Sequence, residues 1–378
     1  MREQPLAVCA DDSGIITEVP GIAAAGRCGR TLQPITTADL IILPRGSTLY
    51  RLPERYAVGY DSRAGTLHRM NSAAVAAFLP PGYTATALAA FDREAGAPML
   101  PLYCYCALCW YHGKFYVPAI RVDKDPKHDP SSFDRAEVSK RVKQMLRKNP
   151  DNRLLAHHGN VCALQYHCPN AANLFLGRWE APVAVSGSCN SACRGCISKQ
   201  NAGSVTSSQT RIDFTPTVEE ILGIAVPHLE QAPRAMISFG QGCEGEPLLK
   251  GRLIENAIRA IRRQTTRGTI HLNTNGSKPK TVQRLIDAGL NSIRISLNSA
   301  RPKLYRAYYR CDSYTFSDVV KSFKVARMAG LMVSANYLTF PGVTDDGDEY
   351  SFFRELLVDA KPDMIQWRNL NIDPDCYM

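Results

Sequence analysis

The chain has 378 residues, a hydrophobic content of 45%, a charged content of 21% and a formal net charge of +10. This length is enough for two domains with separate cores, and the composition is typical of a soluble globular protein. The sequence has neither a basic start followed by a long apolar run nor an apolar segment of membrane-spanning length. We therefore expect no secretion signal and no membrane partner, and we interpret the protein as cytoplasmic.

The charge and the thirteen cysteines restrict the function further. In a reducing compartment, thiols serve as metal ligands or as buried small hydrophobes more often than as disulfides. Two predicted helices, 135–148 and 250–267, hold much of the basic charge. Basic surfaces attract polyanions, so RNA is a candidate partner. Solvated faces of ordinary helices have the same composition, so the charge alone defines no partner.

Residues 1–130 are predicted to form a mainly β N-terminal accessory domain, because the apolar runs 40–43, 56–60 and 115–122 are short and broken by Pro and Gly. The segment from 102 to 117 (LYCYCALCWYHGKFYV) predicts a β-hairpin. In that hairpin Cys104 and Cys106 share one face and Cys109 points to the other.

A second metal is one interpretation of the cysteines upstream of residue 170, and burial as small hydrophobes is the other. The candidate ligands are Cys104, Cys106, Cys109, Cys162 and Cys168, with His157, His158 and His167 as additional donors.

Residues 131–181 are predicted to be a helical connector with a helix over 133–148, and residues 182–378 alternate strands with helices. The predicted strands are 182–187, 234–240, 269–275, 292–298, 331–340 and 363–369. The predicted helices are 217–231, 253–265, 279–288, 315–329 and 348–360. Thr217 with Glu220 forms a capping box, and Gly289 and Gly330 stand at helix ends. This alternation predicts parallel βαβ units and a partial (β/α)6 barrel in the α/β class.

The strands have polar residues at alternate positions. A parallel sheet that is covered on both faces is usually almost entirely apolar. Because strand side chains alternate in direction, each polar set faces one side, and we expect a polar barrel interior. The alternative is an open sheet with one solvated face. The polar positions are His271, Asn273, Asn275, Arg294, Ser296, Asn298, Ser334, Asn336, Gln366 and Arg368.

The most specific motif follows the first of these strands, where CNSACRGC contains Cys189, Cys193 and Cys196. Three closely spaced thiolates can hold three irons of a four-iron–four-sulfur cluster and leave the fourth iron without a protein ligand. A closed zinc site would need a fourth ligand nearby. The spacing therefore indicates chemistry at an open iron.

With this motif, residues 182–370 resemble the radical S-adenosylmethionine (SAM) superfamily. The resemblance implies that SAM chelates the open iron and that the reduced cluster cleaves SAM to methionine and a 5′-deoxyadenosyl radical, which abstracts hydrogen from a substrate. It also implies an external electron donor such as flavodoxin or ferredoxin, and sensitivity to oxygen. The protein would supply binding, orientation and exclusion of water.

Further motifs resemble the family's SAM-binding positions in chain order. In SFGQGCEGEPLL, the residues Gly245 and Glu246 would receive the SAM amino group, with Glu244 as a competitor for this role. Asn275, Ser296 and Asn298 would contact the carboxylate and ribose, and Arg310 would pair with the carboxylate. The loop LTFPGVTD resembles the adenine-contacting loop, with Asn336 facing the barrel interior.

Other features depart from the family or stay open. Gly195 stands where the family usually has an aromatic residue. Cys243 is a buried residue or a hydrogen-atom donor, and packing is the simpler interpretation. Tyr305, Tyr308 and Tyr309 are typical of one helix face rather than a radical relay. Trp367 is expected to pack on the outer helices. We also expect no cysteine-rich C-terminal extension, because about ten residues follow the sixth predicted strand.

The sequence thus predicts a radical SAM enzyme whose substrate and catalytic residues are unknown. Arg294, Gln366 and Arg368 would meet a substrate with acidic or amide groups, and RNA, a peptide and a small metabolite remain open. The alternative is a metal-stabilised nucleic-acid-binding or scaffold protein that catalyses no reaction.

Overall fold

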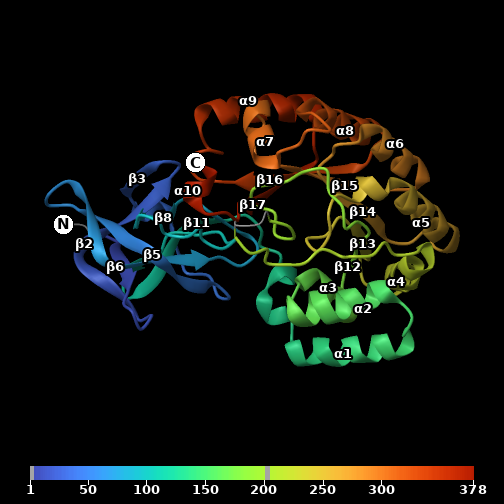
Figure 1. The fold of residues 1–378 in the computed structure, drawn as a ribbon, viewed down its shortest axis with the longest axis horizontal. Helices are drawn as coiled ribbons and strands as arrows, with labels where there is room; N and C mark the ends of the chain where they lie inside the picture. Colours follow the sequence, from blue (N-terminus) through green and yellow to red (C-terminus); the bar gives the residue numbers. More distant parts are fainter. Residues whose placement is uncertain (1–3, 201–204) are drawn as a thin grey trace.

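The computed structural model describes residues 4–200 and 205–378. Two sheets form the two halves of the chain, and a small group of helices connects them (Figure 1). Within the described residues, no helix has the length and apolar character needed to cross a membrane.

The N-terminal half forms an 11-stranded antiparallel sheet. Its main path has the order β3-β2-β5-β6-β1-β10-β11-β4, and β7, β8 and β9 pair with β11, β2 and β5. The mainly β character that the short apolar runs predict is confirmed. The strands are β1 (Leu6–Ala10), β2 (Ile16–Cys28), β3 (Thr31–Pro34), β4 (Leu40–Ile42), β5 (Thr48–Asp61), β6 (Thr66–Phe78), β7 (Tyr83–Ala85), β8 (Leu88–Ala89), β9 (Phe91–Arg93), β10 (Cys109–Tyr111) and β11 (Lys114–Arg121).

The predicted hairpin consists of β10 and β11 and is shorter than expected. His112 and Gly113 both have positive φ, at 46° and 73°, which fits a two-residue turn whose twist matches the flanking strands. Residues before Cys109 run as a loop instead of a strand. In this loop Cys106 makes isolated bridges with Ala77 and Leu88.

The connector consists of α1 (Arg135–Lys148), α2 (Arg153–Ala156), a π-helix (His157–Gln165) and α3 (Pro169–Phe175). Asp134 caps α1 by accepting hydrogen bonds from the backbone N–H groups of the first turn. Arg153 in α2 binds the Glu220 carboxylate with its Nε at 2.8 Å, which holds the connector to the first helix of the second sheet. The π-helix was not predicted, and π-helices are rare.

The C-terminal half contains a 6-stranded parallel sheet in the order β12-β13-β14-β15-β16-β17, which confirms the predicted partial barrel. The strands are β12 (Glu180–Val183), β13 (Met236–Phe239), β14 (Thr269–Thr274), β15 (Ser292–Leu297), β16 (Met332–Thr339) and β17 (Met364–Asn369). The helices α4 (Val218–Gln231), α5 (Gly251–Gln264), α6 (Pro279–Ala288), α8 (Phe316–Met328) and α9 (Gly347–Ala360) lie along its outer side (Figure 1).

Two differences from the sequence prediction have physical reasons. The first strand lies earlier than 182–187 because the Glu180 side chain is buried and accepts a hydrogen bond from Ser238 Oγ at 2.5 Å across the sheet. A short helix, α7 (Pro302–Tyr309), was not predicted as an element. Its three tyrosines, Tyr305, Tyr308 and Tyr309, are all buried and lie on one helix, as a packed helix face requires.

The sheet has an apolar outer face and a polar inner face. On β15, Ile293, Ile295 and Leu297 are inaccessible to water, whereas the alternating residues Arg294 and Ser296 are partly accessible. Covering helices account for the apolar set, since α8 contacts β15. The polar set therefore faces the barrel interior. This arrangement favours the predicted polar interior over the alternative of an open sheet with one solvated face.

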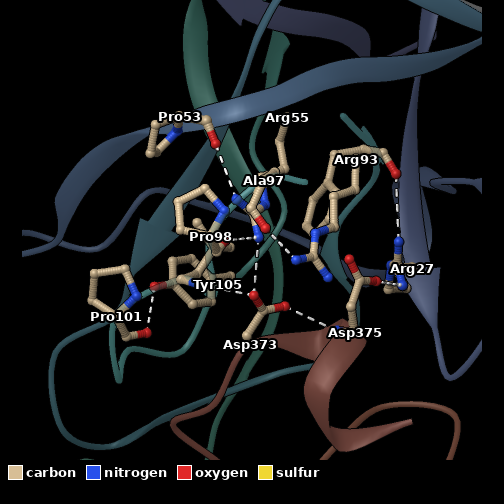
Figure 2. A network of polar contacts seen from close by, with 12 residues as sticks. Arg27, Pro53, Arg55, Arg93, Ala97, Pro98, Pro101, Tyr105, Asp373 and Asp375 are labelled. Carbon is tan, nitrogen blue, oxygen red and sulfur yellow. Dashed lines mark hydrogen bonds and ion pairs between the residues drawn. The ribbon is translucent and has the colours of Figure 1, made fainter. Parts of the chain in front are cut away.

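The two halves share a buried polar junction (Figure 2). Arg55 in β5 is 1% exposed, and its guanidinium contacts the carboxylate of Asp373 at 3.1 Å and the carbonyl oxygen of Pro98 at 2.6 Å. Arg27 pairs with Asp375 at 2.7 Å in the short C-terminal helix α10 (Pro374–Tyr377). The N-terminal sheet is thus attached to the segment that follows β17.

A second junction lies at the edge of the parallel sheet. Asn369 at the end of β17 accepts a hydrogen bond from Ala85 N at 2.9 Å and donates one to Tyr83 O at 3.0 Å, both in β7. Gly29 N donates to Pro341 O at 2.7 Å in the loop after β16. One apolar core cluster runs from Val8 in β1 to Ile372 after β17. The accessory domain therefore packs directly against the carboxyl ends of β16 and β17.

Candidate iron–sulfur and SAM site

The three motif cysteines lie in an irregular loop that follows β12. Cys189, Cys193 and Cys196 are partly buried, and each thiol is free of disulfide bonds. The loop is fixed from the side of α7, because Ala192 N donates to Tyr309 O at 3.0 Å and Arg194 N donates to Tyr308 O at 3.1 Å. These hydrogen bonds set the path of the backbone on both sides of the second cysteine, Cys193.

The three thiols have different electrostatic environments. Burial and the neighbouring thiols raise the pKa of Cys193, and burial also raises the pKa of Cys189. Burial alone would raise the pKa of Cys196, but contacts with Ser198 at 3.6 Å and Arg211 at 3.5 Å outweigh it and lower that pKa. Thiolate is the ligand form, so Arg211 favours the species that binds iron. The donor set fits the cluster that the spacing predicts.

The loop after β13 that contains Gly245 and Glu246, called the glycine–glutamate loop, supports the cysteine loop through its backbone. Gly245 N donates to Ser186 O at 2.6 Å, and Glu246 N donates to Ser188 O at 2.8 Å. An added Cβ on Gly245 would lie 2.0 Å from Ser188 O, so only glycine allows this approach. The predicted residue Gly245 therefore lies beside the cysteine loop.

The two competing carboxylates have different surroundings. The Glu244 carboxylate accepts four backbone N–H groups, from Val185, Ser186, Gly240 and Gln241, at 2.7 to 3.0 Å. These four bonds use the accepting capacity of the group. The Glu246 carboxylate accepts three, from Leu248 N at 3.0 Å, Thr274 Oγ1 at 2.5 Å and Asn275 N at 2.9 Å. Only Glu246 keeps an accepting position for another donor.

Both carboxyl groups are buried, and burial raises the pKa of each to about 7. Hydrogen bonds act in the opposite direction and lower these values. A cation beside Glu246 would favour its charged form.

Asn275, directly after β14, connects the strand end to the cysteine loop. Its Nδ2 donates to Asn190 Oδ1 at 2.9 Å and contacts Ser191 Oγ at 3.2 Å, and both partners lie between Cys189 and Cys193. Ser277 N donates to its Oδ1 at 3.0 Å. The Asn275 side chain is therefore engaged with the loop, which places it next to the cysteines.

Three other predicted polar residues lie at neighbouring strand positions. Asn336 Nδ2 in β16 donates to Ser296 Oγ in β15 at 3.3 Å. Asn298, 1% exposed, donates to Tyr377 Oη at 3.2 Å. The Oδ1 atoms of Asn336 and Asn298 are buried, and neither has a hydrogen-bond partner among the described residues. Buried acceptors without partners are rare, and they point to a donor that a ligand supplies.

The barrel interior also holds two arginines and a glutamine. Burial and the positive charge of Arg368 lower the pKa of Arg294, whereas the Arg368 side chain itself is exposed to solvent. Within the part of the chain that the structure describes, Arg294 Nε and Gln366 Oε1 are buried without hydrogen-bond partners. Arg310 is different: it ends α7 with φ of 48° and is exposed.

Gly195, where the related family usually has an aromatic residue, faces aromatic groups from elsewhere in the chain. An added Cβ would lie 2.8 Å from Tyr308 Oη and 3.3 Å from Asn371 O. Tyr377 lies edge-on to Tyr308 with ring centroids 6.1 Å apart. The space that a side chain at 195 would need is thus filled by α7 and the C-terminal segment.

Sequence reasoning missed several residues of this site. Arg211 and Asn371 reach the cysteine loop from distant positions, and Tyr377 contacts Asn298. The residue types of these three gave no motif signal. Tyr308 was assigned to a helix face, which is correct, but its contact with Gly195 was not foreseen.

The candidate ligands for a second metal fall into two places. Cys106 contacts Pro118 O at 3.7 Å and Cys109 contacts Tyr116 O at 3.5 Å, and burial raises the pKa of Cys104 and of Cys109 to about 12. These thiols belong to the apolar core of the N-terminal sheet. Cys162 lies elsewhere, close to His157 and Cys243.

Trp367 contacts the outer layer as expected, with its ring centroid 6.0 Å from that of Phe353 in α9.

Comparison with known proteins gives a family for part of the chain. The model of the family described as the radical SAM superfamily matches residues 183–352. A GTP 3',8-cyclase from Streptomyces coelicolor is 26% identical over 187 residues, which are 49% of this chain and 48% of the relative. A GTP 3',8-cyclase from Petrotoga mobilis is 29% identical over 179 residues, 47% of this chain and 51% of the relative. The chain spans about half the length of the curated relatives that it matches.

Solved structures give weaker similarity. Native anSMEcpe with bound AdoMet is 15% identical with a TM-score of 0.40, over 51% of this chain and 52% of that chain. Methylornithine synthase is 15% identical with a TM-score of 0.36, over 61% of this chain and 64% of that chain.

Residues 183–352 thus form a domain of the radical SAM superfamily. This superfamily consists of enzymes that use a four-iron–four-sulfur cluster and SAM and that need a reductant.

Proposed function

We propose that the protein binds a four-iron–four-sulfur cluster through Cys189, Cys193 and Cys196 and cleaves SAM reductively. The observation that supports this most directly is a loop with three free thiols beside a polar barrel interior. When bound and reduced, the cluster would supply the electron that converts SAM to methionine and a 5′-deoxyadenosyl radical. The electron would come from a flavodoxin or ferredoxin.

The residues of this chain would bind and orient SAM. Glu246 has one accepting position left, which suits the amino group, and Gly245 lets the loop approach the cysteines. Asn275 contacts the cysteine loop, Asn298 follows β15 and contacts Tyr377, and Ser296 and Asn336 lie on adjacent strands. The partnerless Oδ1 atoms of Asn298 and Asn336 would accept from hydroxyl or amino groups of the ligand. Arg310, exposed at the end of α7, would pair with the SAM carboxylate.

The substrate is proposed to carry an anionic or amide group. Arg294 and Arg368 face the interior, and for neither guanidinium is a salt bridge present within the described ranges. Arg294 is partly buried and Arg368 is exposed, and Glu180 offsets part of the Arg294 charge. The remaining positive charge on this face attracts anions. The relatives are named for GTP, which is an anion, and this is compatible with an anionic substrate. RNA and acidic peptides share this chemistry.

Anaerobic incubation with dithionite and SAM tests the reaction. The reconstituted protein should produce 5′-deoxyadenosine, and the Cys189→Ala variant should produce none. Cys106→Ala is the matched control, since Cys106 is a buried thiol in the N-terminal core and should leave production unchanged. Lack of 5′-deoxyadenosine from iron-loaded wild-type protein would contradict the proposal and favour a scaffold without turnover.

The substrate class is tested by binding to the inactive protein. Binding partners trapped on the Cys189→Ala variant from the native cell should be anions, and they should be lost from an Arg294→Gln, Arg368→Gln variant. RNA as substrate requires a steep loss of affinity with added salt. Equal retention of partners by both variants would contradict the role of the two arginines.

A further inference from the structure

His157, Cys162 and Cys243 form a compact group that does not include the cluster cysteines. One ring nitrogen of His157 and the two Sγ atoms all lie within 4.8 Å of one another. Both cysteines are buried, at 3% and 5% exposure, and His157 is partly buried. Each thiol is free of disulfide bonds.

The π-helix brings two of these residues together. His157 and Cys162 are five positions apart, and a π-helix aligns residues i and i+5, whereas an α-helix aligns i and i+3 or i+4. The hydrogen bond from Tyr166 N to Val161 O at 3.0 Å has this five-residue spacing. Such wide turns are uncommon and often occur at functional sites.

The ring of His157 has an unused donor or acceptor. Its Nε2 is buried and has no hydrogen-bond partner among residues 4–200 and 205–378. The ring lies edge-on to Phe214 and His158, with centroids 6.3 and 5.7 Å apart, and these contacts fix its orientation without satisfying Nε2. A buried polar atom without a partner costs free energy unless a ligand satisfies it.

We propose that His157, Cys162 and Cys243 bind a zinc ion that is separate from the iron–sulfur cluster. Imidazole nitrogen and thiolate sulfur are the donors that zinc prefers, and three protein ligands within this radius fit a tetrahedral site with a fourth position. Each thiol loses its proton to solvent when the metal binds. Cys168 is adjacent in the fold, since its N–H donates to Cys162 O at 2.8 Å, but its sulfur is not in the set within 4.8 Å, so a water molecule would take the fourth position.

The zinc ion would support the cysteine loop indirectly, through the glycine–glutamate loop. Cys243 directly precedes Glu244, Gly245 and Glu246, whose carboxylate and backbone groups hold residues 185–188 next to Cys189. A metal bond from Cys243 to the π-helix would tie this loop to the helical connector. The role is structural, and no step of SAM cleavage passes through the zinc ion.

The test is metal analysis of anaerobically purified, full-length protein grown with zinc. Zinc should be present at about one ion per chain in addition to iron. X-ray absorption at the zinc edge should give sulfur neighbours at about 2.3 Å and a nitrogen neighbour at about 2.0–2.1 Å. This measurement uses the wild-type protein, so it does not depend on whether a variant folds.

Variants separate this site from the cluster. Cys243→Ala and His157→Gln should lower zinc affinity by more than about tenfold, since even loss of an outer-shell partner costs about 10–100-fold, while Cys106→Ala should retain it. Cys189→Ala should lose iron and keep zinc, so failure of the proposed function and failure of this inference are distinguishable. Wild-type protein without zinc, or with a disulfide between Cys162 and Cys243 under anaerobic conditions, would overturn the proposal.

Discussion

Gly245 has no space for a side chain, because an added Cβ would lie 2.0 Å from Ser188 O and 3.0 Å from Cys189 N. Both atoms belong to the backbone, which cannot move aside as a flexible side chain can. The backbone of the glycine–glutamate loop therefore packs directly against the backbone at the first motif cysteine, Cys189.

We predict that Gly245→Ala displaces the cysteine loop and costs about 1–3 kcal/mol of stability, as overpacking in a dense region does. Iron retained per chain after anaerobic reconstitution should fall several-fold. Gly347→Ala is the matched control, since no atom lies within 4 Å of its added Cβ and the position opens α9. Equal iron content in the two variants would contradict the proposed constraint.

Glu244 offers a second residue-level test that is independent of metal content. Its carboxylate accepts four backbone N–H groups from two loops. In Glu244→Gln, one oxygen becomes an NH2 group that faces two of these donors, so two buried N–H groups lose their acceptor.

Glu244→Gln should therefore lower the free energy of unfolding by about 2–4 kcal/mol, measured by anaerobic urea denaturation. Glu137→Gln should cost less than about 0.5 kcal/mol, because its ion pair with Arg141 in α1 is exposed. Similar losses in both variants would show that the four hydrogen bonds do not stabilise the fold.

At the level of elements, the sequence predicts the strands and helices whose positions depend on the pattern of their own residues. Strand alternation and helix caps predicted β13 to β17 and their helices closely, because the period of each element is visible in its own residues. The cysteine spacing located the loop for the same reason. The start of β12 was misplaced because the burial of Glu180 depends on Ser238 in the neighbouring strand.

Contacts between distant segments were not predictable from local pattern. Arg211 and Asn371 approach the cysteine loop, and Tyr377 approaches Asn298, only when the chain is folded. The group His157, Cys162 and Cys243 depends on the rare π-helical turn, and the five-residue spacing would separate the first two residues on an α-helix.

The contact between β14 and β15 contains a pH-dependent group. His271 Nδ1 lies 2.8 Å from Ser292 Oγ, and the residue is 2% exposed. Burial and the positive charge of Arg294 lower the pKa of His271 from 6.5 to about 3. The unfolded chain thus binds more protons between these values, so stability falls as pH decreases below 6.5.

We predict that protonation of His271 in the unfolded chain lowers the free energy of unfolding by about 1 kcal/mol between pH 7.5 and pH 5.5. His158 and His228 also have lowered pKa values, so the wild-type protein has further pH dependence. The difference between wild-type protein and His271→Gln in anaerobic urea unfolding at the two pH values isolates this residue. An identical pH dependence in both proteins would show that His271 is not held neutral.

At the scale of the whole molecule, the N-terminal sheet reaches the cluster loop through the C-terminal segment. Asp373 accepts hydrogen bonds from Arg55 at 3.1 Å and from Leu100 N at 2.8 Å (Figure 2). Two residues before it, Asn371 Nδ2 contacts Gly195 O at 3.5 Å. A change at the junction with the accessory domain is therefore transmitted over a short stretch of backbone to the residue before Cys196.

We predict that Asp373→Asn destabilises the protein by about 3–5 kcal/mol, because it leaves the buried Arg55 guanidinium without a counter-charge. Hydrogen exchange should become faster in residues 371–378 and in the cysteine loop, and affinity for SAM should fall. Asp312→Asn is the control, since its pair with Arg306 is 92% exposed on the aspartate side and contributes little. The contrary result is faster hydrogen exchange in residues 371–378 only, with exchange in the cysteine loop unchanged. That result would mean that the N-terminal sheet stabilises the fold without supporting the metal site.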